Sequence, residues 1–152
     1  MLVSLHVIVS AIVSIILYPF LGWYTLVFFL SAFLIDVDHY IEYAVEKKDL
    51  SLVRAYKSYM HYYHKNKANI KKGNELEHYK LHFHIFHFIE VLIIISLLSF
   101  IHKFFLYVTL GMVFHIIQDL IGLFFVRFVM KANLGRAGRY YSLIYYLIKM
   151  KD

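Results

Sequence analysis

Residues 2–35 read LVSLHVIVSAIVSIILYPFLGWYTLVFFLSAFLI and contain no Asp, Glu, Lys or Arg. The stretch is interrupted only by the chain's single proline, Pro19, and by the Gly22–Trp23 pair. A helix that crosses a bilayer needs roughly 20 apolar residues, with a range of about 17–25. We therefore expect two short membrane-spanning helices, over about residues 2–18 and 20–35, joined by a tight turn.

Two further apolar stretches follow, at about residues 84–101 and 104–126. The chain of 152 residues is 61% hydrophobic, whereas a soluble domain is about 45–50% apolar. The excess apolar surface requires lipid rather than water around it. The sequence therefore predicts one all-α domain over residues 1–152, an integral membrane four-helix bundle.

The positive charges are distributed very unevenly along the chain. Residues 41–81 hold nine Lys and Arg, residues 127–152 hold six, and Lys103 is the only other one. With four spans, the N-terminus, the middle segment and the tail share one side, which then carries 15 of the 16 positive charges. The positive-inside rule makes that side cytoplasmic. We therefore place the protein in the cell membrane with both termini in the cytoplasm, and we attribute its net charge of +6 to topology rather than to a nucleic-acid partner.

The middle segment, residues 41–81, contains more than a linker. Leu50 to Lys67 mixes four tyrosines with lysine and arginine. Aromatic rings favour headgroup depth, and basic side chains favour anionic lipid, so we expect a helix that lies on the membrane surface. The tail, residues 131–152, contains an apolar aromatic stretch too short to span, and we expect it to lie in the interface as well.

Ionisable side chains recur within or beside the predicted spans, where they are costly and therefore suggest a function. They are His6 in the first span; Asp36, Asp38 and His39 after the second; His82, His84 and His87 at the start of the third; and His115 and Asp119 in the fourth. Four antiparallel spans would bring these segments to one membrane face at similar depth. Because the chain has no cysteine, a metal there would be held by His and Asp, a donor set that suits zinc or manganese.

The local spacing also suits metal coordination. His115 and Asp119 are four residues apart, about 40° around a helix, so both project from one face. Asp36 and His39 are three residues apart, as are His84 and His87. Helix geometry alone favours His84 rather than His82 as the partner of His87. The alternative is structural: a hydrogen-bonded His115–Asp119 pair could simply stabilise helix packing.

The ordered set of motifs resembles the YdjM-type family of membrane-bound metal-dependent hydrolases. That family has an early His, a Leu-Pro-Asp-x-Asp-His motif, a His-Arg-x-x-Thr-His-Ser motif and a Gly-x-x-x-His-x-x-x-Asp motif. The matching positions here are His6, Leu34–His39, His82–Phe88 and Gly111–Asp119. The chain departs from the pattern at Ile35 for Pro, Phe83 for Arg and Phe88 for Ser.

The resemblance implies an enzyme with one or two divalent metal ions, zinc or alternatively manganese. It favours His82 over His84, and the implied ligands are His6, Asp36, Asp38, His39, His82, His87, His115 and Asp119. The family's similarity to zinc-dependent phospholipase C and P1-type nucleases implies phosphoester hydrolysis. Asp38, if not itself a ligand, would act as the catalytic proton acceptor. A site at the cytoplasmic membrane face suits a lipid-like, amphiphilic phosphoester substrate.

Three rival functions remain open at this point. The chain could bind or transport a metal without hydrolysis, or it could be a degenerate family member that serves as a binding partner, because the family's Arg and Ser are absent. It could also hold a b-type haem between two of His82, His84, His87 and His115, although the neighbouring carboxylates count against haem.

Overall fold

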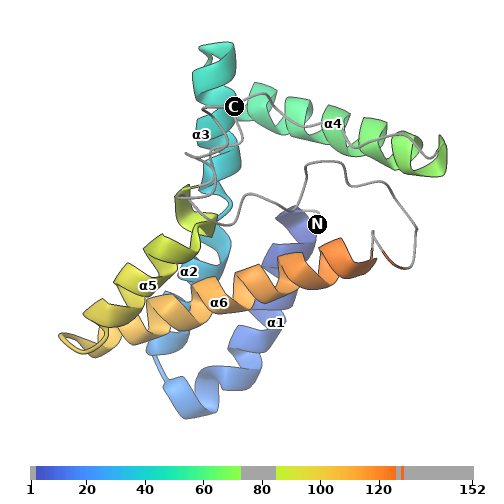
Figure 1. Ribbon diagram of the computed structural model, residues 1–152. Coiled ribbons are helices and arrows are strands. Elements are labelled where there is room, and N and C mark those ends of the chain that lie inside the picture. Colours follow the sequence, from blue (N-terminus) through green and yellow to red (C-terminus); the bar gives the residue numbers. More distant parts are fainter. Residues whose placement is uncertain (1–2, 73–84, 126–127, 129–152) are drawn as a thin grey trace.

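The computed structural model describes residues 3–72, 85–125 and 128, and the regular secondary structure in these residues is entirely helical (Figure 1). The elements are α1 (Val3–Leu21), α2 (Tyr24–Leu34), α3 (Val37–Lys47), α4 (Leu52–Lys72), the short 3₁₀ helix η1 (Ile85–His87), α5 (Ile89–Leu98) and α6 (Lys103–Phe124). The prediction of an all-α protein is confirmed. His82, His84, Phe83 and the interfacial tail at 131–152 lie outside the described residues.

Three described helical segments are long and apolar enough to cross a membrane: Ser4–Leu21, Tyr24–Lys47 and Lys103–Phe124. This agrees with a membrane protein. The predicted third span, residues 84–101, differs, because its described part is the three-residue η1 followed by α5, an apolar helix of only ten residues. A fourth crossing, and which side faces the cytoplasm, stay predictions.

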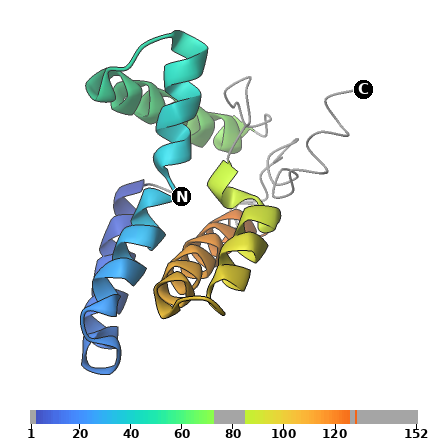
Figure 2. The same cartoon turned by 90° about the vertical axis from the view of Figure 1, so that its left-hand side faces the viewer.

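The turn between the first two helices lies later than predicted. Pro19 lies inside α1, which continues to Leu21 rather than ending at residue 18, and α2 begins at Tyr24 rather than at residue 20. Gly22 makes the turn with a φ of +55°, a left-handed conformation that glycine adopts without a steric penalty. Its N–H donates to the Tyr18 carbonyl at 2.9 Å. The two helices then run side by side (Figures 1 and 2).

Close packing of α2 against α6 sets the position of the candidate site. A Cβ atom added at Gly111 would lie only 2.1 Å from Ser31 Oγ and 2.4 Å from the Phe28 carbonyl oxygen. Small residues allow this close approach of helix backbones in membranes. Gly111, Met112, His115 and Gln118 are all buried on α6, so the face that touches α2 is also the face that carries His115.

After the second predicted span, the chain resumes as a helix following a break of only two residues. Ile35 and Asp36 form a short break, in which the Asp36 N–H donates to the Phe33 carbonyl at 3.3 Å, and α3 begins at Val37. We expected Asp36, Asp38 and His39 to follow the end of a span. Instead they lie at a junction between two helices that together form one 24-residue apolar segment.

A polar corner then turns the chain from α3 into α4. The Asp49 carboxylate accepts hydrogen bonds from Arg54 Nε at 2.5 Å, from the Tyr43 hydroxyl at 2.6 Å and from the Ser51 N–H at 3.0 Å. Arg54 and these donors hold the pKa of the Asp49 carboxyl well below its usual range. Beyond the corner, α4 runs across the direction of α3 (Figure 1). The helix predicted over Leu50–Lys67 is therefore present, but it begins at Leu52 and extends to Lys72.

Candidate metal centre

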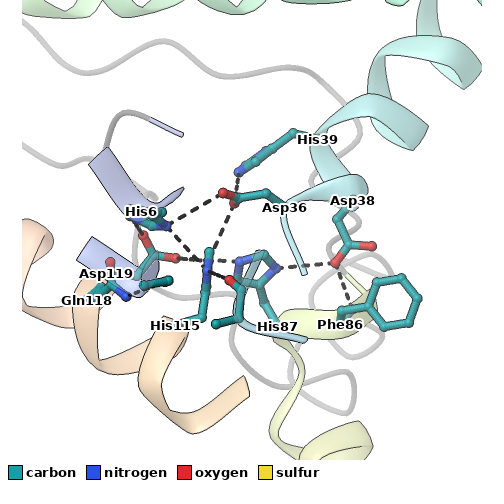
Figure 3. Close-up of polar contacts among 11 residues, drawn as sticks. His6, Asp36, Asp38, His39, Phe86, His87, His115, Gln118 and Asp119 are labelled. Atoms are coloured by element: carbon teal, nitrogen blue, oxygen red, sulfur yellow. Dashed lines mark hydrogen bonds and ion pairs between the residues drawn. The ribbon is translucent and has the colours of Figure 1, made fainter. Parts of the chain in front are cut away.

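Side chains from four separate segments meet at one point in the structure (Figure 3). They come from α1, the α2–α3 junction, η1 and α6, and they are His6, Asp36, His87, His115 and Asp119. The site is nearly closed to solvent, because His6 is 2% exposed and His115 is fully buried. The predicted convergence of distant segments is therefore present in the fold.

The orientation of the His115 ring is set by the backbone of α2. His115 Nδ1 lies 2.7 Å from the Ala32 carbonyl oxygen, which can only accept a hydrogen bond. The proton therefore belongs on Nδ1, and a neutral ring presents the Nε2 lone pair. That lone pair faces two carboxylate oxygens, Asp36 Oδ1 and Asp119 Oδ2, each at 3.4 Å. Lone pairs converging in this way repel unless a cation or a proton lies between them.

His87 is oriented in a similar way by Asp38. The Asp38 Oδ2 atom lies 3.2 Å from His87 Nδ1 and also accepts the Phe86 N–H at 2.7 Å. This contact directs His87 Nε2 toward Asp119 Oδ2, at 3.5 Å. Histidines that bind metals usually donate their other ring N–H to a carboxylate or carbonyl group, which fixes the tautomer and the ring orientation. His87 and His115 both have this arrangement.

His6 completes the cluster from α1. Its Nε2 atom lies 3.3 Å from Asp119 Oδ1, and its Nδ1 atom lies 3.6 Å from Asp36 Oδ2. The two carboxylates thus each face more than one imidazole. Within the described part of the chain, two triads bring a ligand atom from each member within 4.8 Å of the others: His6–His115–Asp119 and Asp36–His87–His115.

The spacing of these atoms fits a bound metal better than it fits hydrogen bonds. Zinc binds nitrogen and oxygen at about 2.0–2.1 Å in tetrahedral sites, which places neighbouring ligand atoms about 3.3 Å apart. Four separations in the cluster, of 3.3–3.5 Å, match this distance between ligand atoms, whereas N–H···O hydrogen bonds cluster near 2.9–3.0 Å. Among the buried side-chain atoms without a hydrogen-bond partner are three atoms of this cluster: His6 Nε2, His115 Nε2 and Asp36 Oδ2. The residues present therefore fit a divalent metal ion.

The charges of the buried carboxylates also favour a bound cation. Asp36, Asp38 and Asp119 are buried or nearly so, with side-chain exposures of 7%, 1% and 17%. Among the Lys and Arg side chains whose burial the structure describes, none is buried. Buried carboxylates need a nearby counter-charge. Among the described residues, the groups at this site that can carry positive charge are its imidazoles, and a bound cation would supply the same charge.

The remaining predicted ligands have different positions. His39 is 36% exposed and lies at the rim, with Nε2 3.7 Å from Asp36 Oδ1 and its ring 6.2 Å from that of Tyr59 on α4. Neither His39 nor Asp38 belongs to the two triads. Asp38 is close to the centre, but one of its oxygens is used to hold His87.

Sequence reasoning missed a polar pair beneath the cluster. The Gln118 side-chain amide donates to Ser10 Oγ at 3.2 Å, and both residues are buried. Ser10 is four residues from His6, and Gln118 is three residues from His115, so each shares a helix face with a candidate ligand. Polar residues at helical spacing from a ligand were the signal that could have identified them.

Comparison of the chain with protein-family models, with curated proteins and with solved structures found no match. The resemblance to the YdjM-type family therefore rests on the motif residues alone.

Proposed function

We propose that this protein is a membrane-bound, metal-dependent hydrolase of the YdjM type that cleaves an amphiphilic phosphoester. One observation carries the proposal: His115 Nε2 faces Asp36 and Asp119 oxygens in a buried site at the separation of metal ligands. An N/O donor set of this kind accommodates zinc, or alternatively manganese. The two triads leave room for one ion or two.

The residues divide into holding and positioning groups. His6, Asp36, His87, His115 and Asp119 would hold the metal, with His39 and His82 as further candidates. When bound, a divalent metal polarises a phosphoryl oxygen and makes a water molecule more acidic. Asp38 Oδ2 orients His87, while Asp38 Oδ1 is buried without a hydrogen-bond partner. That Oδ1 atom is the candidate acceptor of the water's proton.

The membrane setting supports an amphiphilic substrate. In the proposed topology the chain crosses four times, with α5 and its flanking residues as the third crossing, and the metal centre lies at the cytoplasmic face. The α4 helix lies beside that face and exposes apolar and aromatic side chains, including Leu52, Val53 and Tyr56, alongside basic ones. Such a helix suits contact with lipid headgroups. A phosphate at headgroup depth could then reach the centre.

Metal analysis of the purified protein tests this proposal. We expect one or two zinc or manganese ions in the wild type and loss of metal in Asp119→Ala and His115→Ala. His61→Ala, which removes an exposed histidine on α4, is the matched control and should retain full metal. All variants should keep their helical circular dichroism. Full metal content in both site variants would refute the assignment, and metal-loaded wild type would then enter a phosphoester screen.

The second candidate is a metal-binding or metal-transporting membrane protein without hydrolytic activity. The substitution of the family's Ser by Phe88 favours it, because this residue next to His87 is buried and has an apolar ring instead of a hydroxyl. Tightly bound metal with no turnover of any phosphoester would support this alternative.

A further inference from the structure

An apolar groove is lined by chain neighbours of the candidate metal ligands and runs between α2, α5 and α6. It has a volume of about 560 Å³ and is lined by residues of α2, α6, η1 and α5, with Val37 at the start of α3. Ligand pockets commonly measure about 300–1,000 Å³. The lining includes one polar side chain, Ser31, whose hydroxyl donates to carbonyls of its own helix at 2.8 and 3.0 Å. The groove therefore suits a hydrocarbon rather than a polar ligand.

One end of the groove adjoins the candidate metal centre. Ile35 and Val37 line it on either side of Asp36. Phe86 also lines it, while the Phe86 N–H donates to Asp38 beside His87. On α6, Met112 lies one turn before His115. The same short segments thus build both the polar centre and the near end of the groove.

The groove's length matches one leaflet of a bilayer. Its lining runs from Ile35 back to Val27 on α2, and from Met112 back to Phe104 on α6. Eight residues of helix correspond to about 12 Å in each case. Half of a hydrocarbon core is about 15 Å. Exposed lining residues, including Leu30 and Phe104 at 40% and 42%, leave the groove open toward lipid.

We infer that the groove binds the hydrocarbon tail of a single-chain amphiphilic phosphoester, entering sideways from one leaflet, with its phosphate at the metal centre. This inference rests on the proposed function, because the metal centre supplies the headgroup site. It adds the substrate's tail and its direction of entry. The alternative occupants are bulk lipid without headgroup selection and a second copy of this chain.

Photolabelling of the full chain in lipid nanodiscs tests the inference. The probe is an alkyl phosphonate with a diazirine at the end of its chain. Its alkyl chain is joined to phosphorus by a C–P bond, so there is no ester there to hydrolyse. A matched alkyl alcohol serves as the headgroup control. We expect the phosphonate to label the far end of the groove, around Val27–Leu30 and Phe104–Val108, more strongly than the alcohol does.

A groove-filling substitution provides the critical comparison. Val108→Trp should reduce this labelling about tenfold, because the larger indole would occupy the space that the tail needs. Leu106→Trp, on an exposed position of the same helix outside the groove, should not. Labelling spread over lipid-facing residues, or unchanged in Val108→Trp, would overturn the inference, as would crosslinks to a second copy.

Metal removal separates this inference from the proposed hydrolase activity. With a chelator, the excess of phosphonate over alcohol labelling should disappear. The inferred substrate would be contradicted if groove labelling were the same with and without the chelator and the same for the phosphonate and the alcohol. This would hold even if the protein binds metal. Metal-dependent groove labelling without turnover of any ester would support the binding site while rejecting hydrolysis.

Discussion

At the scale of single residues, the geometry of the metal centre depends on which nitrogen of each histidine already has a hydrogen-bond acceptor beside it. His115 and His87 each have Nδ1 beside an oxygen acceptor, Ala32 O and Asp38 Oδ2 respectively. Their Nε2 atoms therefore point toward the Asp119 carboxylate. A histidine and an aspartate four residues apart predict proximity, but only this hydrogen bonding identifies the nitrogen that faces the centre.

Asp38→Asn tests whether Asp38 acts by positioning His87. We expect metal affinity to fall by about 10–100-fold without being abolished, as is usual when a group that orients a metal-binding histidine is altered. Competition with a chromogenic chelator would measure the affinity. If Asp38 is a direct ligand, the loss should equal that of Asp119→Ala. If it acts as the proton acceptor, turnover should fall more than metal affinity does.

At the scale of elements, helix junctions differ most from prediction. Both predicted boundaries near Pro19 lie three or four residues too early, because proline is tolerated near the end of α1 and Gly22 makes the turn. The predicted end of the second span is instead the Ile35–Asp36 break between α2 and α3. Hydropathy marks apolar stretches but does not reveal where a helix resumes after a short break.

Two glycines should respond differently to alanine. Gly111→Ala should destabilise the protein by about 1–3 kcal/mol, because the new Cβ overlaps Ser31 and Phe28 of α2. It should also weaken metal binding, since His115 lies one turn away. Gly22→Ala should cost about 1–2 kcal/mol through its left-handed backbone, with space around the added methyl and unchanged metal affinity. Thermal unfolding and metal titration of both variants would measure the contrast. Equal metal affinities in the two variants would refute the role of the α2–α6 contact.

At the scale of the whole molecule, antiparallel packing gathers distant residues at one end. His6 and His115 are 109 positions apart, yet their Nδ1 atoms lie 3.3 Å from each other. The α3–α4 unit lies beyond that end, whereas the connection between α5 and α6 lies at the opposite end of the helices (Figure 1). The proposed topology requires these two regions to be on opposite sides of the membrane.

The absence of cysteine makes this topology directly testable. Single cysteines introduced as His61→Cys on α4 and as His102→Cys before α6 should react from opposite sides. An impermeant maleimide added to intact cells should label His102→Cys, while His61→Cys should require permeabilised cells. Wild type provides the unlabelled control. Reaction of both cysteines from the same side would reject the four-crossing arrangement, and a reversed pattern would reject the assigned orientation.

The sequence by itself determined the helical class, the apolar segments and the identity and order of the candidate ligands, because hydropathy and helical spacing are local properties. It also predicted that eight ligand residues would meet. The structure brings five of them together, His6, Asp36, His87, His115 and Asp119, while Asp38 and His39 lie beside them and His82 is outside the described residues. Only the tertiary structure decided that Asp38 orients His87, that His39 lies at the rim and that the helix resumes at Val37. Spacing sets the direction of a side chain relative to its own helix axis. The rotation of one helix against another depends on packing, here on the contact of Gly111 with α2.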